Sequence, residues 1–73
     1  MNVQELRQMC IVTRETMLQK LERPQDIETR ELLDAIKYFR HETQPDETLR
    51  KLNQEIADKA ENILFERLNR QNL

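Results

Sequence analysis

Apolar residues recur at spacings of three and four along most of this chain, the pattern of helices that each turn one face inward. In the first segment the recurring positions are Val3, Leu6, Cys10, Thr13, Met17 and Leu21, with Met9, Ile11 and Leu18 widening the stripe and Val12 outside it. The resulting apolar arc is wider than the roughly 100° that one packing face requires. We therefore predict a first helix over residues 3–21 with surplus apolar surface.

Polar residues and prolines mark where the helices should begin. Asn2, followed three residues later by Glu5, has the form of a capping box, in which a side-chain acceptor and a returning carboxylate satisfy the free N–H groups of the first turn. Pro24 suits the first turn of a second helix, since its missing N–H costs nothing there. We predict this helix over residues 25–42, and a third helix over residues 46–69 after the break at 43–45.

The second and third segments each carry one regular apolar stripe. The positions predicted to be buried are Leu32, Ala35, Ile36 and Phe39 in the second helix and Leu49, Leu52, Ile56, Ala60, Ile63 and Leu64 in the third. Ile27 and Tyr38 are predicted to project from the other side of the second helix. Because short connections favour antiparallel neighbours, we expect an all-α domain spanning residues 1–73. It is either a small three-helix bundle or a helical hairpin with a long C-terminal helix.

The amino-acid composition favours helices and bears on the cellular compartment of the protein. The 73 residues include no glycine and one cysteine, and a charged fraction of 36% yields a net charge of only -2. One cysteine excludes a disulfide within the chain and fits a reducing compartment. The opening MNVQELRQMC lacks the apolar run of a signal peptide. No stretch approaches the roughly 20 apolar residues of a membrane span, so we expect no membrane association and a cytoplasmic location.

The residues that enzymes and metal sites need are scarce. Nucleophilic catalysis requires a nucleophile beside a base, and Cys10 and His41 are the only thiol and imidazole. Cys10 lies on the apolar stripe, where thiols are usually inert. Structural zinc requires about four Cys or His ligands. The sequence after His41, HETQP, is not the HExxH of a helical zinc site. We expect no enzymatic activity, no metal and no cofactor.

Positive charge is too dispersed to favour nucleic-acid binding, which depends on phosphate neutralisation. Arg7, Arg14 and Lys20 lie near one another on the first helix, and we interpret them as a solvated face rather than a DNA-binding surface. A helix-turn-helix protein ranks last among the hypotheses, since the recognition helix would be acidic. Sequence-specific DNA binding is not expected.

Binding of a protein partner is the class that the pattern favours most. The surplus apolar residues of the first helix either wrap a small core or face a partner, and Met9 suits an adaptable binding surface. Tyr38 is an aromatic with a polar tip, which suits an interface anchor or partial burial against a neighbouring helix. A third apolar group, Phe65, Leu68 and Leu73, lies near the C-terminus and would extend the core or support self-association.

The opening NVQELRQM, the length and the nearly neutral helical character resemble the small transcription regulators of Xanthomonas bacteriophages. The resemblance implies a protein of the host bacterial cytoplasm that binds the RNA polymerase subunits β and β′. It also implies inhibition of initiation by favouring loss of the σ factor, and antitermination later. The implied polymerase contacts come from the N-terminal segment, here Asn2, Val3, Gln4, Glu5, Leu6 and Arg7. We add Met9 from the surplus apolar surface of the first helix and Tyr38 as an aromatic interface anchor.

An alternative hypothesis is a homodimeric helical adaptor or scaffold protein. The three-four spacing of Leu49, Leu52, Ile56 and Ile63 resembles the seam of a coiled coil, although Lys59 and Arg67 interrupt a strict heptad. In that case the third helix would pair with the same helix of a second copy. The interruptions favour a monomer over a homodimer.

Overall fold

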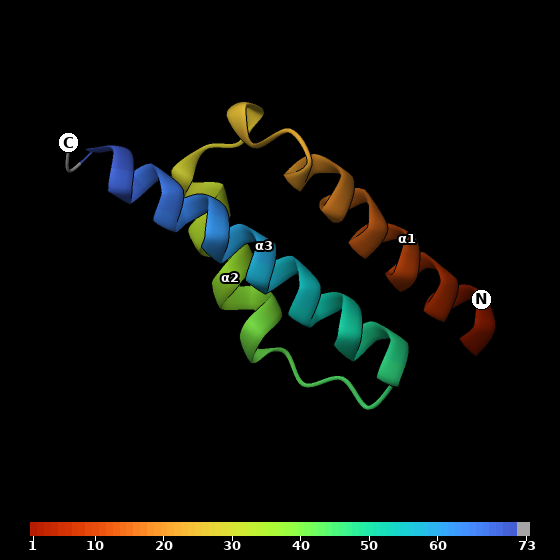
Figure 1. Ribbon diagram of the computed structural model, residues 1–73. Coiled ribbons are helices and arrows are strands. Elements are labelled where there is room, and N and C mark those ends of the chain that lie inside the picture. The colour runs from red at the N-terminus through yellow and green to blue at the C-terminus, as the bar shows by residue number, and fades with distance from the viewer. Residues whose placement is uncertain (72–73) are drawn as a thin grey trace.

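Three α-helices and a short 3-10 helix make up the computed structural model, which describes residues 1–71. The elements are α1 (Val3–Leu21), η1 (Pro24–Asp26), α2 (Thr29–His41) and α3 (Glu47–Gln71). Both α1 and α2 pack along the long α3, with α1 and α3 running in the same direction and α2 running back between them in sequence (Figure 1). The prediction of a small all-α bundle with a long C-terminal helix is confirmed.

Side-chain contacts show the register of the helices. Arg7 reaches Asp46 and Arg14 reaches Asn53, and the two partners in each pair are 39 residues apart. A constant separation means that α1 and α3 advance together, as parallel helices do. Between α2 and α3 the order reverses, because Arg40 reaches Asp58 while the earlier Thr29 receives a hydrogen bond from the later Arg67. The topology is therefore up-down-up.

The first helix begins where the sequence predicts. Asn2 is the N-cap of α1, with extended backbone, and its Oδ1 accepts a hydrogen bond of 2.8 Å from the backbone N–H of Glu5. This bond satisfies one of the N–H groups that the first turn leaves free. Because the cap ends the helix at Asn2, Val3 occupies the first helical position at the tip of the molecule.

The second helix begins at Thr29, four residues later than predicted, and the reason is Ile27. Pro24 starts the separate helix η1, after which Ile27 and Glu28 adopt extended backbone. A helix running from Gln25 would turn Ile27 away from Leu32, which is why it was predicted to project outward. That prediction is wrong, since the extended link turns Ile27 inward and leaves it only 3% exposed.

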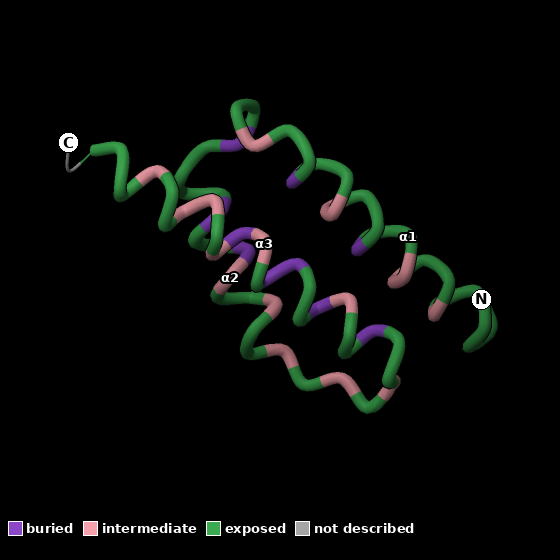
Figure 2. The backbone as a smooth tube through the Cα atoms, viewed as in Figure 1, coloured by how far each residue is buried: buried purple, intermediate pink, exposed green. Residues whose placement is uncertain are grey.

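The apolar core lies toward one end of the bundle. Its buried cluster consists of Leu21, Ile27, Leu32, Ala35, Ile56 and Ala60, with Met17, Leu18, Ile36, Phe39 and Ile63 packed against it. Leu49 and Ala57 are also buried. Thus α1 joins the core from Met17 onward, and its earlier residues lie beside α3 outside the cluster. In Figure 2, α1 is buried only at scattered points on its inner side.

The molecule is a short rod rather than a sphere. Its extents are 51 × 21 × 16 Å and the radius of gyration of its Cα atoms is 13.6 Å. A spherical domain of this length has a radius of about 11 Å. The long α3 continues to Gln71, two residues past its predicted end, and the predicted role of Leu73 falls outside the described residues. An elongated shape leaves much of each helix at the surface.

Candidate partner-binding site

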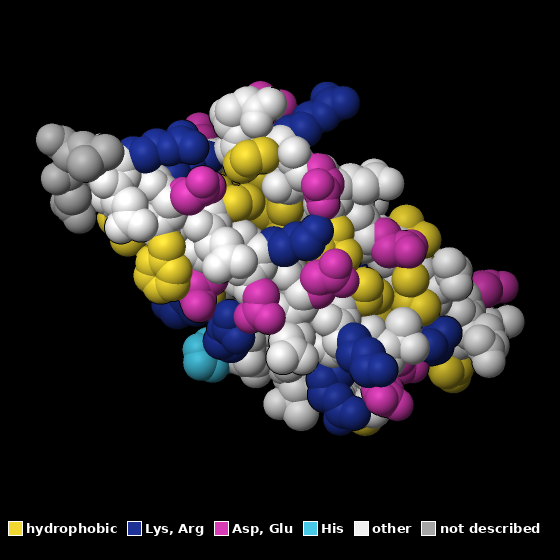
Figure 3. Space-filling view, viewed as in Figure 1, with side chains coloured by type: hydrophobic (Ala, Val, Ile, Leu, Met, Phe, Trp, Pro, Cys, Tyr) yellow, Lys and Arg dark blue, Asp and Glu magenta, His cyan; other side chains and the backbone are white. Residues whose placement is uncertain are grey.

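The predicted apolar residues of the N-terminal segment lie at the surface. Val3 is 81% and Leu6 is 54% exposed, and Met9 and Val12 are about half exposed. Asn2, Gln4 and Glu5 are exposed as well, whereas Arg7 is partly buried. On the face in view in Figure 3, hydrophobic side chains reach the surface along α1 between charged ones. Val3, Leu6, Met9 and Val12 are therefore open to solvent. Leu18, which also widens the apolar stripe, packs against the core.

Tyr38 lies on the same flank of the molecule as Leu6. The ion pair between Lys20 and Glu31, 2.9 Å long, spans the flank where α1 and α2 face each other. Leu6 lies fourteen residues before Lys20 on the same face of α1, and Tyr38 lies seven residues after Glu31 on the same face of α2. Because the two helices are antiparallel and Lys20 is level with Glu31, Tyr38 is level with Thr13, about two turns from Leu6 along this flank. We call Leu6, Met9 and Tyr38 the flank patch, with Val3 at its tip.

The phenol of Tyr38 is held in place although its ring is exposed. Its hydroxyl donates a hydrogen bond of 3.0 Å to Oε1 of Glu42, and its ring meets Phe39 edge to face with the centroids 4.8 Å apart. The hydrogen bond to the Glu42 carboxylate raises the pKa of the Tyr38 phenol. An aromatic side chain that is fixed in one orientation loses little conformational entropy when it is covered, which suits an interface anchor.

The predicted basic face of α1 does not exist as a free cationic surface. Each of its three members has a carboxylate partner: Arg7 pairs with Asp46 at 2.6 Å, Arg14 with Glu42 at 2.5 Å and Lys20 with Glu31 at 2.9 Å. Arg14 is moreover only 5% exposed, so its interpretation as a solvated residue is wrong. The physical reason is that acidic residues of α2, and of the link that follows it, lie directly opposite.

Arg14 is the centre of a polar network that joins all three helices. Its Nε donates to Oδ1 of Asn53 at 2.6 Å, its Nη1 donates to the carbonyl of Cys10, and its guanidinium lies 5.6 Å from the ring centroid of Phe39. The amide of Asn53 completes the network by donating to Oε2 of Glu42 at 2.9 Å. We call Arg14, Glu42, Asn53 and Tyr38 the Arg14 network.

The network satisfies the polar groups that it buries. Among residues 1–71 every buried side-chain nitrogen and oxygen has a hydrogen-bond partner. Desolvation raises the pKa of Glu42, but hydrogen bonds from Asn53, Tyr38 and Arg14 lower it more, so the carboxyl has a pKa below its usual value. Sequence reasoning missed Asn53 and Arg14 as buried residues. The available signal was their separation of 39 residues, which becomes informative only once the helix register is known.

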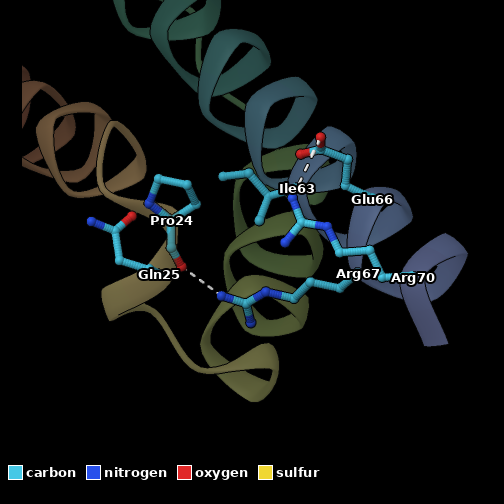
Figure 4. A pocket seen from close by; sticks show the side chains of 6 residues that line it. All are labelled: Pro24, Gln25, Ile63, Glu66, Arg67 and Arg70. Carbon is cyan, nitrogen blue, oxygen red and sulfur yellow. Dashed lines mark hydrogen bonds and ion pairs between the residues drawn. The ribbon is translucent and has the colours of Figure 1, made fainter.

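A hollow lies where α3 passes the link between α1 and α2, away from the tip of α1. Its lining residues are Pro24, Gln25, Ile63, Glu66, Arg67 and Arg70 (Figure 4). The guanidinium of Arg67 points at the link and donates to the carbonyls of Pro24 and Ile27 and to Oγ1 of Thr29. Its donors are therefore engaged by the protein itself, and Arg67 acts as a structural clamp on η1.

The stripe proposed for a coiled-coil dimer is used within the chain. Leu49 and Ile56 are buried, and Leu52 and Ile63 are partly buried, against the other two helices. A dimer through this seam would require the bundle to open. Phe65 and Leu68 remain exposed on another side of α3.

Within residues 1–71, no group of three or more His, Cys, Asp and Glu side chains is placed to hold a metal ion. Across the same residues, each helix falls short of the length and apolarity needed to cross a bilayer. No protein-family model matches the chain, and comparison with curated proteins and with solved structures gives no significant match.

Proposed function

We propose that this protein is a non-enzymatic transcription regulator that binds the β and β′ subunits of bacterial RNA polymerase in the cytoplasm of the host. In this proposal it inhibits initiation by favouring loss of the σ factor, and it acts as an antiterminator later in transcription. The observation that carries the proposal is the exposure of Val3, Leu6 and Met9 at the tip of α1. The resemblance of the opening NVQELRQM to phage regulators supplies the identity of the partner.

The arrangement of the exposed residues supports a binding surface over ordinary scatter. Single exposed apolar side chains are normal on proteins. Here Leu6 and Met9 share a flank with the fixed ring of Tyr38, and Val3 extends that flank at the end of the rod. Neighbouring positions carry hydrogen-bonding groups, including Gln4 and Glu5, so the apolar centre has a polar rim, as protein interfaces do.

A protein this small regulates polymerase through an equilibrium. It binds the core enzyme more tightly when σ is absent, and by mass action it then shifts the population toward the σ-free enzyme. A tenfold preference corresponds to about 1.4 kcal/mol, which a modest interface supplies. Neither a catalytic group nor DNA contact is needed for this effect.

The test measures affinity for purified bacterial core polymerase by biolayer interferometry, with and without saturating σ. Leu6→Asp and Val3→Asp should each weaken binding more than about tenfold, because an unpaired carboxylate would be buried in the interface. Both residues are exposed, so the helix content measured by circular dichroism should not change. Saturating σ should lower the affinity of the unaltered protein.

The matched control is Leu33→Asp, which introduces the same charge at a leucine of α2 that is 47% exposed, close to the 54% of Leu6. It should bind like the unaltered protein. Equal loss in all three variants, or no binding of the unaltered protein to core polymerase, would refute the proposal. Loss of helicity in Leu6→Asp would instead assign Leu6 to the stability of the bundle.

A further inference from the structure

The first helix is attached to the bundle in two different ways along its length. Its last part contributes Met17, Leu18 and Leu21 to the apolar core. In the part before Met17, the buried residue is Arg14, a charged side chain, while Cys10 and Ile11 are only partly buried. Apolar burial therefore fixes the C-terminal part of α1, and polar contacts fix the N-terminal part.

Both arginines of this N-terminal part bind the connection between α2 and α3. Arg7 and Arg14 lie seven residues apart, or two turns, on the same face of α1. Arg7 pairs with Asp46 and Arg14 with Glu42, so the two carboxylates bracket the link 43–45. Asp46 also caps α3, since its Oδ1 accepts from the N–H of Leu49 at 3.2 Å. The link thus holds α1 through two ion pairs.

The two attachments respond differently to water. The free-energy cost of exposing buried apolar surface grows in proportion to the area exposed. A buried ion pair is close to balanced, because hydration of the separated charges offsets much of their attraction. Separating Arg14 from Glu42 returns both charges to water, whereas removing Leu21 from Ile56 and Leu32 exposes core surface. Opening before Met17 is accordingly the smaller step.

We propose that residues 3–16 of α1 dock and undock as one unit, that the C-terminal part of α1 stays in the core, and that Glu42 is the main contact holding the docked state. Undocking separates the first helix from Tyr38 and divides the flank patch, so the docked fraction sets how much of that patch is assembled. The device belongs to the free chain and does not depend on polymerase being the partner.

Hydrogen exchange of the free protein, followed by mass spectrometry, tests the proposal in Glu42→Gln. The Gln amide keeps one acceptor oxygen, so it can accept from Asn53 or from Tyr38 but not from both as the carboxylate does, and it carries no charge to pair with Arg14. Exchange of residues 3–16 should accelerate about tenfold or more, since a hydrogen bond between charged groups is lost. Exchange of the segment around Ile56–Ala60 should stay within about twofold.

Glu47→Gln is the matched control, because it removes the same charge near the same link from an exposed pair with Lys51. It should leave the exchange of residues 3–16 unchanged. Cys10, the one cysteine of the chain, gives an independent readout. Its alkylation by iodoacetamide should be faster in Glu42→Gln than in Glu47→Gln, because its thiol is partly buried only while α1 is docked.

Two results would overturn the proposal. Equal acceleration in α1 and in the segment around Ile56–Ala60 would mean that Glu42→Gln lowers global stability without selective undocking. Unchanged exchange and unchanged alkylation would mean that the Glu42 contact does not hold α1. Arg7→Gln removes the second, partly exposed ion pair and should have little effect on global stability. It should accelerate exchange in residues 3–10, and unchanged exchange there would mean that the link does not hold the N-terminal part of α1.

Discussion

Arg14 is buried in this structure, although arginine side chains are mostly exposed on proteins. Its guanidinium meets Glu42, Asn53 and the ring of Phe39. A charge in such a place is tolerated only because each of its partners is aligned with a donor. Removing Arg14 alone would leave the Glu42 carboxylate without its cationic partner and would take one donor from Oδ1 of Asn53.

Arg14→Ala should lower the free energy of unfolding by about 3 kcal/mol, the cost of breaking a buried pair from one side. Urea denaturation followed by circular dichroism measures it. Arg30→Ala is the control, because Arg30 forms an exposed pair with Asp34 and should matter by less than about 0.5 kcal/mol. Equal effects of the two substitutions would show that the Arg14 network contributes nothing beyond a surface pair.

Acid should weaken the same contacts. Hydrogen bonding and the charge of Arg7 lower the pKa of Asp46, and the pKa of Glu42 is also lowered. A carboxyl whose pKa is lower in the folded state stabilises the fold above its unfolded pKa, and this contribution disappears as the pH falls through the folded value. Stability should therefore be constant from neutral pH down to roughly pH 4 to 5 and decline below it.

The pH dependence is measured as the urea midpoint at several pH values between neutral and acid. Glu42→Gln should show a shallower acid decline than the unaltered protein, because one of the carboxyls with a lowered pKa has been removed. Parallel acid declines in the two proteins would contradict the assignment of this carboxyl. Glu47→Gln, which alters an exposed pair, should decline in parallel with the unaltered protein.

At the scale of elements, the connection between α1 and α2 contributes to the packing of the bundle as the helices do. The link between α1 and α2 contains η1 and the buried Ile27, and it is held from α3 by Arg67. Backbone carbonyls in such a link need donors, and Arg67 supplies them from a distance of 40 residues in sequence. The link is consequently part of the packed structure and not a loose loop.

Arg67→Ala should lower the free energy of unfolding by about 1–2 kcal/mol, because partly buried carbonyls of Pro24 and Ile27 lose a charged donor. Thermal and urea unfolding followed by circular dichroism check the value. Arg70→Ala, one turn further along α3, is the matched control. Its pair with Glu66 is exposed, so less than about 0.5 kcal/mol is expected. The assignment fails if Arg70→Ala is as damaging as Arg67→Ala.

At the scale of the whole molecule, the apolar stripe of α3 packs against the other two helices, so it is not available to form a coiled-coil dimer. Leu49 and Ile56 lie in the interior, and the exposed apolar residues are spread over α1, α2 and the distal part of α3. Separated small patches do not make an interface of the size that stable dimers bury. We therefore predict that the protein is a monomer in solution.

Sedimentation equilibrium should give the molar mass of one chain across a hundredfold range of concentration. A mass that rises toward twice that value would favour the homodimeric adaptor. Phe65→Glu, on the exposed side of α3, would then identify the surface, since it should restore the monomer only if the distal part of α3 forms the dimer contact. If Leu6→Asp still sedimented as a dimer, the dimer contact would not include the flank patch.

The sequence by itself determined the helices, their approximate ends and the apolar stripes of α2 and α3. Those properties depend on local backbone preferences and on the helical period, both of which are readable from neighbouring residues. Asn2 as the cap of α1 and Leu32 and Ile56 as core residues belong to this group. The exposure of Val3 and Leu6 does not belong to it, because the width of the apolar stripe left open whether these residues wrap the core or face solvent.

Only the tertiary structure decided the environment of Ile27 and of Arg14. Ile27 turns inward because two extended residues end η1 before α2 begins, a backbone choice that core packing rewards and local preference does not reveal. Arg14 is buried because Glu42 and Asn53, 28 and 39 residues away, converge on it. The partners of a buried charge come from other helices, so its fate depends on register, which no local pattern encodes.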